Sequence, residues 1–257
     1  MSMAMVAAVA MTGFAWPEGK KAAVSLTYDD GIQSQLDNAG PALDKAGLKG
    51  TFFLPCGNWL VTSKPEAWAA LSKNGHELAS HTMTHPCSKT FSFVKEGQAL
   101  EDYDEPRITK ELDDTLAILA KLTGTAGPFS FAYPCGNDFY GPDKKSYVPL
   151  LKTRFTSARS GGNPPGDPMT LDLYQVPSYV TSEKDTGASL ISFVERSMAS
   201  GGWAVFMIHG VGGDYITVSN PAHQELLEYL AKSKKDLWVT PFGTAANWVA
   251  KAQKAAK

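Results

Sequence analysis

Two aspartates stand side by side where an apolar run of the chain ends. Asp29 and Asp30 follow the run "AAVSLTY" and precede Gly31. An Asp-Gly pair is an ordinary turn signal, so a solvated turn explains these residues in the simplest way. The repulsion between neighbouring carboxylates is relieved, however, when one is protonated or when both receive a cation. The pair therefore indicates a turn or a cation site, and other residues must decide between them.

Histidines supply the other groups that such a site needs. His81 and His85 lie four residues apart in "HTMTH". If this segment is helical, both imidazoles lie on one face and reach one metal ion, although surface or capping histidines explain a lone pair equally well. One aspartate added to the pair gives three protein ligands and leaves positions for water and substrate. His209, which ends the run "AVFMIH", adds a group that can carry a proton.

Other residues of these types have simpler explanations. We expect His76 to be structural and His223, in "NPAHQELL", to cap a helix or to be exposed in its first turn. Trp59, in the loop "CGNW", is a candidate platform for a sugar ring, although tryptophans more often belong to the core. The three cysteines each follow a proline, and their odd number argues against a disulfide scaffold. Whether two of the cysteines form one disulfide near the strand ends stays open.

Strand-like apolar runs alternate with helix-like segments along the chain. The runs are residues 22–28, 49–54, 76–80, 129–134, 155–159, 173–179, 203–209 and 237–242. Seven or eight β-α units of this kind predict a parallel sheet covered by helices. No glycine-rich phosphate loop follows the first run, and this length favours a closed or nearly closed barrel over an open sheet. In such barrels the chemistry takes place at the carboxyl ends of the strands, where all five candidate side chains fall.

Length and composition agree with one globular unit. The chain has 257 residues, which we interpret as a single domain over residues 1–257, and a net charge of −2. A net charge of this size does not indicate a nucleic-acid-binding surface, and no apolar run approaches the ~20 residues that a membrane span needs. The N-terminal stretch "AMVAAVAM" has the look of a truncated secretory signal, but no basic residue precedes it, which favours an ordinary first strand. The compartment therefore stays open, either secreted or periplasmic, or cytoplasmic.

Four short motifs resemble those of a known family. In the order "TYDDG", "HTMTH", "AYPCG" and "MIH", they are similar to the motifs of the polysaccharide deacetylases, the NodB-like domain of carbohydrate esterase family 4. The resemblance runs from about residue 20 to the C-terminal helix. It implies a distorted (β/α) barrel of seven or eight parallel strands. It also implies a divalent metal, for which Zn²⁺ is our expectation and Co²⁺ or another transition metal the alternative.

The resemblance implies a role for each matching residue. Asp29 corresponds to the general base and His209 to the general acid. The backbone N–H of Cys135 takes the place of an oxyanion donor, and Met207 that of an apolar residue in the acetate pocket. The implied metal ligands are Asp30, His81 and His85.

The third and fourth motifs depart from the family pattern. The third commonly begins with an arginine that orients the base, but here Ala132 stands at that position, and Cys135 replaces the common aromatic residue. Arg159, which ends "FTSAR", can supply a guanidinium from a neighbouring strand, although a solvated loop arginine is an equal explanation. The usual fourth motif, with a tryptophan and aspartates, is not evident around "VPSYVTSEKD". Groove shape and substrate therefore stay open.

The sequence thus predicts a metal-dependent hydrolase that removes acetyl groups from a carbohydrate partner. We favour N-deacetylation of an N-acetylglucosamine polymer over O-deacetylation of a glycan such as xylan. One alternative is hydrolysis of a small amide or cyclic imide, since relatives with this barrel do such work. A catalytically silent carbohydrate-binding protein is the other, and the presence of base, ligands and acid argues against it. The oligomeric state is open.

Overall fold

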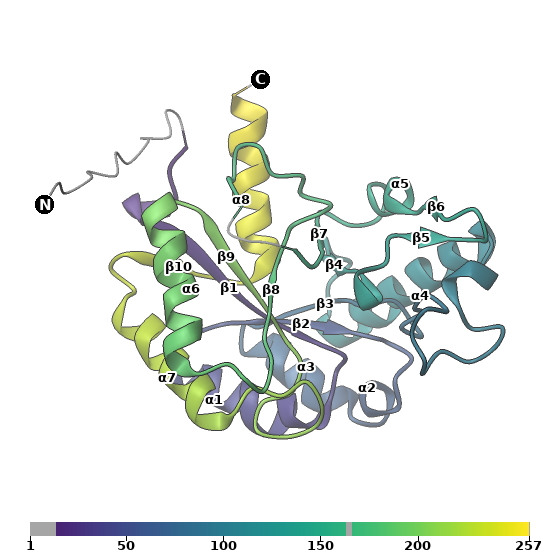
Figure 1. The fold of residues 1–257 in the computed structure, drawn as a ribbon, viewed down its shortest axis with the longest axis horizontal. Coiled ribbons are helices and arrows are strands. Elements are labelled where there is room, and N and C mark those ends of the chain that lie inside the picture. Colours follow the sequence, from purple (N-terminus) through teal and green to yellow (C-terminus); the bar gives the residue numbers. More distant parts are fainter. Residues whose placement is uncertain (1–13, 163–165, 257) are drawn as a thin grey trace, which may run out of the picture.

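A computed structural model describes residues 14–162 and 166–256 (Figure 1). The apolar N-terminal stretch, for which the sequence favoured a first strand, lies outside the described residues. Within them, no helix is long and apolar enough to cross a membrane.

One parallel sheet forms the centre of the fold. In the described part of the chain, its order is β7-β4-β3-β2-β1-β9-β8, and β10 pairs with the first residues of β1. A bridge between Arg159 of β7 and Val176, in the segment that leads into β8, brings the two outer ends of this order toward each other, so the sheet curls round on itself. The bounds are β1 (Ala22–Asp29), β2 (Thr51–Leu54), β3 (Glu77–Ser80), β4 (Phe131–Ala132), β7 (Ala158–Arg159), β8 (Tyr179–Val180), β9 (Trp203–Ile208) and β10 (Leu237–Val239). The prediction of a distorted α/β barrel with seven or eight parallel strands is confirmed.

The distortion is concentrated in three strands of only two residues each. The apolar runs 129–134, 155–159 and 173–179 are longer than the strands β4, β7 and β8 that form in or beside them. Pro134 and Pro177 have no backbone N–H, so neither can donate to a ladder next to β4 or β8. This side of the barrel is therefore held by fewer backbone hydrogen bonds than the side around β1, which pairs with β9 over six residues.

Helices cover the outside of the barrel (Figure 1). Neighbouring helices pack side by side, α6 against α7, α7 against α1, and α3 against α4. A π-helical turn, Gln35–Ala39, leads into α1, and a short antiparallel hairpin joins β5 (Phe139–Tyr140) to β6 (Lys145–Ser146). The helix bounds are α1 (Gly40–Ala46), α2 (Trp59–Ser63), α3 (Pro65–Lys73), α4 (Glu105–Thr123), α5 (Val148–Leu151), α6 (Gly187–Ser200), α7 (Asn220–Lys232) and α8 (Phe242–Ala255).

Strand β1 is buried on both faces, and its side chains alternate between two apolar clusters. Val24, Leu26 and Tyr28 belong to the large cluster under the covering helices. Ala23 belongs to the second cluster, which also contains Phe53, Ala79, Ala132, Trp203 and Phe242. Because successive side chains point to opposite faces, Asp29 shares the inner face with Ala23. The alternation therefore carries a carboxylate to the inner side of the strand end.

Two histidines outside the candidate site are buried. His223 was expected to cap a helix or to be exposed, and this was wrong. Its Nε2 lies 2.7 Å from the Tyr28 hydroxyl oxygen, and burial lowers the pKa of its imidazole to about 4. The helix begins with Ser219 as its cap, so His223 is free to turn inward toward β1. His76, expected to be structural, accepts a hydrogen bond from the backbone N–H of Gly50 at 3.1 Å.

Candidate active site

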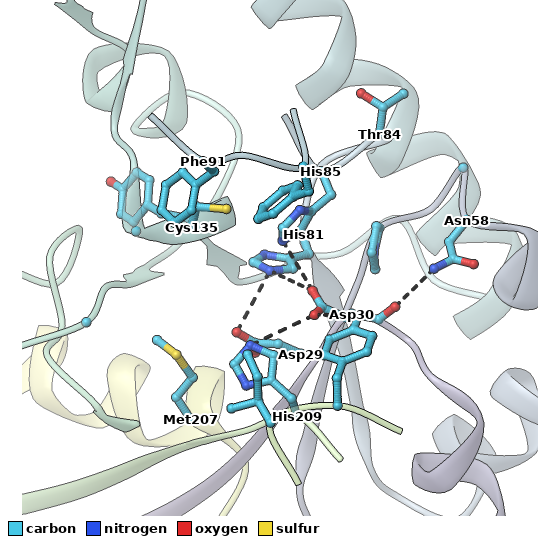
Figure 2. A pocket seen from close by; sticks show the side chains of 18 of the residues that line it. Asp29, Asp30, Asn58, His81, Thr84, His85, Phe91, Cys135, Met207 and His209 are labelled. Carbon is cyan, nitrogen blue, oxygen red and sulfur yellow. Dashed lines mark hydrogen bonds and ion pairs between the residues drawn. The ribbon is translucent and has the colours of Figure 1, made fainter. Parts of the chain in front are cut away.

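A cavity of about 860 Å³ lies at the carboxyl ends of the strands (Figure 2). Its volume is in the range of sites for small ligands. Its walls come from residues at or after the ends of β1, β2, β3, β4, β7, β8 and β9. Seven of the eight residues singled out in the sequence line it, and they are Asp29, Asp30, His81, His85, Cys135, Met207 and His209. The eighth, Arg159, is fully buried next to Asp29.

Asp30 and the two histidines of "HTMTH" converge in this cavity. The Oδ1 atom of Asp30 lies 3.5 Å from His81 Nε2 and 3.2 Å from His85 Nε2. Asp30 has a φ of 80°, so the chain turns sharply as it leaves β1. Figure 2 shows the imidazoles of His81 and His85 on one side of this carboxylate.

The segment 81–85 brings its two histidines together without a helical turn. It is irregular, and Thr82 and His85 have positive φ values of 65° and 56°. The hydroxyl of Thr82 accepts the backbone N–H of His85 at 3.0 Å. Glu111 of α4 accepts the backbone N–H groups of Met83 and Thr84, both at 2.9 Å. The loop geometry is therefore fixed by a carboxylate far along the chain rather than by helical periodicity.

The Asp30, His81 and His85 group fits a divalent cation. Its three ligand atoms lie within 4.8 Å of one another. Asp30 Oδ1 is buried and has no hydrogen-bond partner among the described residues. His81 Nδ1 lies 2.8 Å from the carbonyl oxygen of Ala132, to which it must donate, so the lone pair of Nε2 faces Asp30. Two nitrogens and a carboxylate oxygen form a donor set that suits Zn²⁺.

The charge state of Asp30 also suits a cation site. Burial would raise the pKa of its carboxyl group, but the adjacent imidazoles of His81 and His85 hold this pKa well below its usual range. The carboxylate is therefore ionised and acts only as an acceptor.

A second group of metal-ligating residues is engaged in a covalent bond. His85, Cys87 and Cys135 also bring ligand atoms within 4.8 Å of one another, but Cys87 and Cys135 form a disulfide with a Cα–Cα distance of 5.7 Å. The sequence left open whether such a disulfide forms. It joins the loop that follows β3 to the loop that follows β4, where Cys135 has a φ of 53°. The third cysteine, Cys56, is a buried free thiol.

Asp29 is paired with Arg159 inside the barrel. The guanidinium Nη2 donates to Asp29 Oδ2, while Nη1 donates to the Ser178 hydroxyl at 3.1 Å. The exposed fraction is 0% for the arginine side chain and 3% for that of Asp29. The other carboxylate oxygen, Oδ1, is buried and has no hydrogen-bond partner among the described residues. The guanidinium of Arg159 thus holds one oxygen of Asp29, and the other oxygen can accept a hydrogen bond or a proton.

The register of β4 and β7 explains how Arg159 reaches this place. Ala132 and Arg159 are direct partners on these adjacent parallel strands, so their side chains point to the same side of the sheet. Ala132 belongs to the inner cluster, and its methyl group leaves room for the guanidinium. The arginine that the third motif commonly carries is therefore matched by one at the same level of the next strand.

His209 lies on the opposite side of Asp30 from the histidine pair. Its Nε2 is 3.9 Å from Asp30 Oδ2, and its Nδ1 is buried without a hydrogen-bond partner in the described part of the chain. Burial lowers the pKa of the imidazole, while the charges of Asp29 and Asp30 act in the opposite direction. The side-chain amide of Gln35 donates to the carbonyl groups of Asp29 and His209, which ties the ends of β1 and β9 together.

Sequence reasoning missed Tyr215 and, apart from Trp59, the exposed apolar side chains at the cavity. Tyr215, from the loop after β9, donates its hydroxyl to Asp30 Oδ2 at 2.9 Å. Five of the six large apolar side chains that are exposed in the described residues line the cavity, and they are Trp59, Phe93, Val180, Tyr215 and Ile216. Trp59, the platform candidate, is 74% exposed. Clustered exposed apolar side chains of this kind mark a binding surface.

Comparison with known proteins gives both sequence and structural relatives. The sequence model of the family described as "Polysaccharide deacetylase" matches residues 16–148. Over 98 residues, the chain is 39% identical to a chitin deacetylase of Arthroderma benhamiae, an alignment that covers 37% of this chain. The chain spans 23% of the length of that relative and 9% of another curated relative that it matches.

Solved structures share the fold at low sequence identity. The peptidoglycan deacetylase PdaC of Bacillus subtilis is 17% identical with a TM-score of 0.56, and the alignment covers 91% of this chain and 94% of that one. Puue allantoinase is 16% identical with a TM-score of 0.62, and the alignment covers 91% of each chain.

Proposed function

The chain belongs to the polysaccharide deacetylase family, and we propose that it is a metal-dependent hydrolase that removes acetyl groups from a carbohydrate. The observation that carries this proposal is the convergence of Asp30, His81 and His85, with the unpartnered Oδ1 of Asp30 between the two imidazoles. Asp29, whose Oδ1 also has no hydrogen-bond partner among the described residues, lies beside this group. His81 Nε2 is 3.8 Å from Asp29 Oδ2.

In this proposal each residue has one task. A divalent cation, with Zn²⁺ as the favoured ion, would polarise the acetyl carbonyl and lower the pKa of a water molecule. Asp29 accepts the proton of the attacking water on Oδ1 while Arg159 holds Oδ2 in place. The backbone N–H of Cys135 stabilises the oxyanion, and Met207 lines the acetate pocket. His209 donates a proton to the departing amine or alkoxide.

The cavity rim supports a sugar polymer as the substrate. Exposed side chains such as Trp59 and Phe93 offer flat apolar surfaces on which the faces of sugar rings can stack. We favour an N-acetylglucosamine polymer, and relatives named chitin deacetylase and peptidoglycan deacetylase agree with this choice. An O-acetylated xylan is the second candidate. The structural likeness to an allantoinase keeps a small amide or cyclic imide as a third.

Acetate release from a substrate panel tests this proposal. The panel contains chitin oligosaccharides, peptidoglycan and acetylated xylan, each with and without a chelator; allantoin, which releases no acetate, is assayed under the same conditions by the opening of its ring. We expect acetate from at least one glycan and its loss with the chelator. Activity on allantoin alone would instead support the imide reading, and the absence of turnover and of metal binding would support a silent binding protein.

Two substitutions separate the roles of the adjacent aspartates. Asp30→Ala removes a charged ligand, so bound metal and activity should fall together. Asp29→Asn keeps the three ligands but removes the proton acceptor, so turnover should fall by roughly 10²–10⁴-fold while metal content stays normal. Elemental analysis beside acetate release measures both quantities. Loss of metal in Asp29→Asn with retention in Asp30→Ala would reverse the two roles.

A further inference from the structure

The two oxygens of the Asp30 carboxylate have different neighbours. Oδ1 faces the two imidazoles at 3.5 and 3.2 Å, whereas Oδ2 accepts the hydroxyl of Tyr215 at 2.9 Å. An ionised carboxylate can only accept hydrogen bonds, so the phenol is the donor. A donor on Oδ2 fixes the plane of the carboxylate and thereby the direction of Oδ1. Groups of this kind behind a metal ligand orient it and tune its affinity.

The loop after β9 is built to hold Tyr215 in this position. The residues on either side of it, Asp214 and Ile216, both have left-handed backbones, with φ values of 61° and 45°. This conformation is unfavourable for residues other than glycine, above all for a β-branched one, and persists only where the surroundings impose it. Strain that flanks a single side chain indicates that the position of this side chain matters.

Contacts at both ends of the loop impose the conformation. The carboxylate of Asp214 accepts the backbone N–H of Ser34 at 2.7 Å, and this anchors the loop to the turn that follows Asp30. Within the loop, Val218 donates its N–H to Gly210 at 2.9 Å. A Cβ atom on Gly210 would lie 2.1 Å from the carbonyl oxygen of Gly213, so only glycine fits there. Tyr215 is therefore tethered to the same strand end that carries its partner.

We propose that Tyr215 is a positioning residue that aims Asp30 at the metal. This inference rests on the proposed function, because it concerns the metal group formed by Asp30, His81 and His85. Tyr215 acts through Asp30, since its hydroxyl contacts the carboxylate oxygen that faces away from the histidine pair. Tyr215 is also 51% exposed and lines the cavity.

Tyr215→Phe removes the hydroxyl and keeps the ring. We expect the dissociation constant for Zn²⁺, measured by competition with a chromogenic chelator, to rise by about 10–100-fold. Saturating Zn²⁺ should restore most of kcat, because no group that touches the reacting atoms has been removed. Tyr215→Ala should weaken Zn²⁺ binding to the same extent and raise KM in addition, because the rim also loses its ring.

The matched control is Tyr229→Phe, which removes a phenolic hydroxyl from α7 on the outside of the barrel and should leave the Zn²⁺ affinity unchanged. Unfolding of the metal-free proteins, followed by circular dichroism, checks that each variant is folded. A Tyr215→Phe protein that binds Zn²⁺ within twofold of the wild type would overturn the inference and leave the proposed function intact. A wild type that binds no divalent metal would overturn both.

Discussion

Replacing Arg159 with alanine removes the guanidinium that faces Asp29 inside the barrel. The pair is desolvated, with 0% and 3% of the two side chains exposed, and the guanidinium contacts both Asp29 and the Ser178 hydroxyl. Breaking a buried pair by removing one partner destabilises a protein by about 3–5 kcal/mol, because the remaining charge stays buried. Domains have a total stability of about 5–15 kcal/mol. We therefore expect Arg159→Ala to be folded but clearly less stable.

The catalytic effect follows from the loss of one constraint on Asp29. Without Arg159, Oδ2 has no cation to hold it, and the carboxylate can rotate away from the water that it should deprotonate. A displacement of about 1 Å at a reacting group reduces the rate by about 10²-fold, which corresponds to about 2.7 kcal/mol of barrier. The proposed metal ligands are separate residues, so metal content should stay normal. Arg159→Lys keeps the charge but loses the second donor to Ser178, and it should fall between alanine and wild type.

The register of the barrel provides a rescue experiment. Neighbouring strands lie about 4.8 Å apart, so an arginine at position 132 enters the interior at the same level as Arg159. The double variant Arg159→Ala with Ala132→Arg should therefore regain at least about tenfold in kcat over the single variant. Acetate release at a temperature well below the midpoint of unfolding measures kcat without interference from stability. Wild-type turnover in Arg159→Ala would refute the reasoning, and loss of metal from this variant would show that the arginine supports the ligands instead.

Two further predictions concern stability. The Cys87–Cys135 disulfide closes a loop of 48 residues, so its reduction, or a Cys135→Ala substitution, should lower the free energy of unfolding by about 2–4 kcal/mol; an unchanged denaturation midpoint after reduction would contradict this. Burial lowers the pKa of His223 to about 4, below its usual value of about 6.5, so the unfolded state binds more protons between these values and stability falls as the pH falls. From pH 7 to pH 5 this imidazole should account for a loss of about 2 kcal/mol, and the total loss should be smaller by that amount in His223→Gln; equal pH dependence of the two proteins in urea unfolding would rule out this origin.

The alternation of strands and helices was predictable because its signals are local. Apolar runs of strand length and amphipathic helix patterns depend on neighbours within a few residues. The same holds for the polar groups that end β1, β3 and β9, since a change from apolar to polar residues marks the end of a buried strand. The sequence alone therefore places Asp29, His81 and His209 at one end of the barrel.

Contacts between distant segments were not predictable in the same way. The bond from Tyr215 to Asp30 joins residues 185 positions apart, and it depends on the course of a loop rather than on a periodic pattern. The partner of His223 was unpredictable for the same reason. Its position in the first turn of a helix suggested exposure, while tertiary packing places it against Tyr28. Local signals describe elements well, but the partner of a side chain is decided by how those elements pack.

Arg159 links the candidate chemistry to the weakest part of the barrel. The strands β4, β7 and β8 have two residues each, and β7 is connected to the segment that leads into β8 by the bridge between Arg159 and Val176 and the few backbone hydrogen bonds around it. The guanidinium of Arg159 binds Asp29 on β1 and Ser178 beside β8, so it spans the interior where backbone pairing is sparse. The side chain that we propose orients Asp29 thus also supports the seam of the sheet. Arg159 therefore lies where the fold itself depends on its contacts, in the part of the barrel whose strands are the shortest.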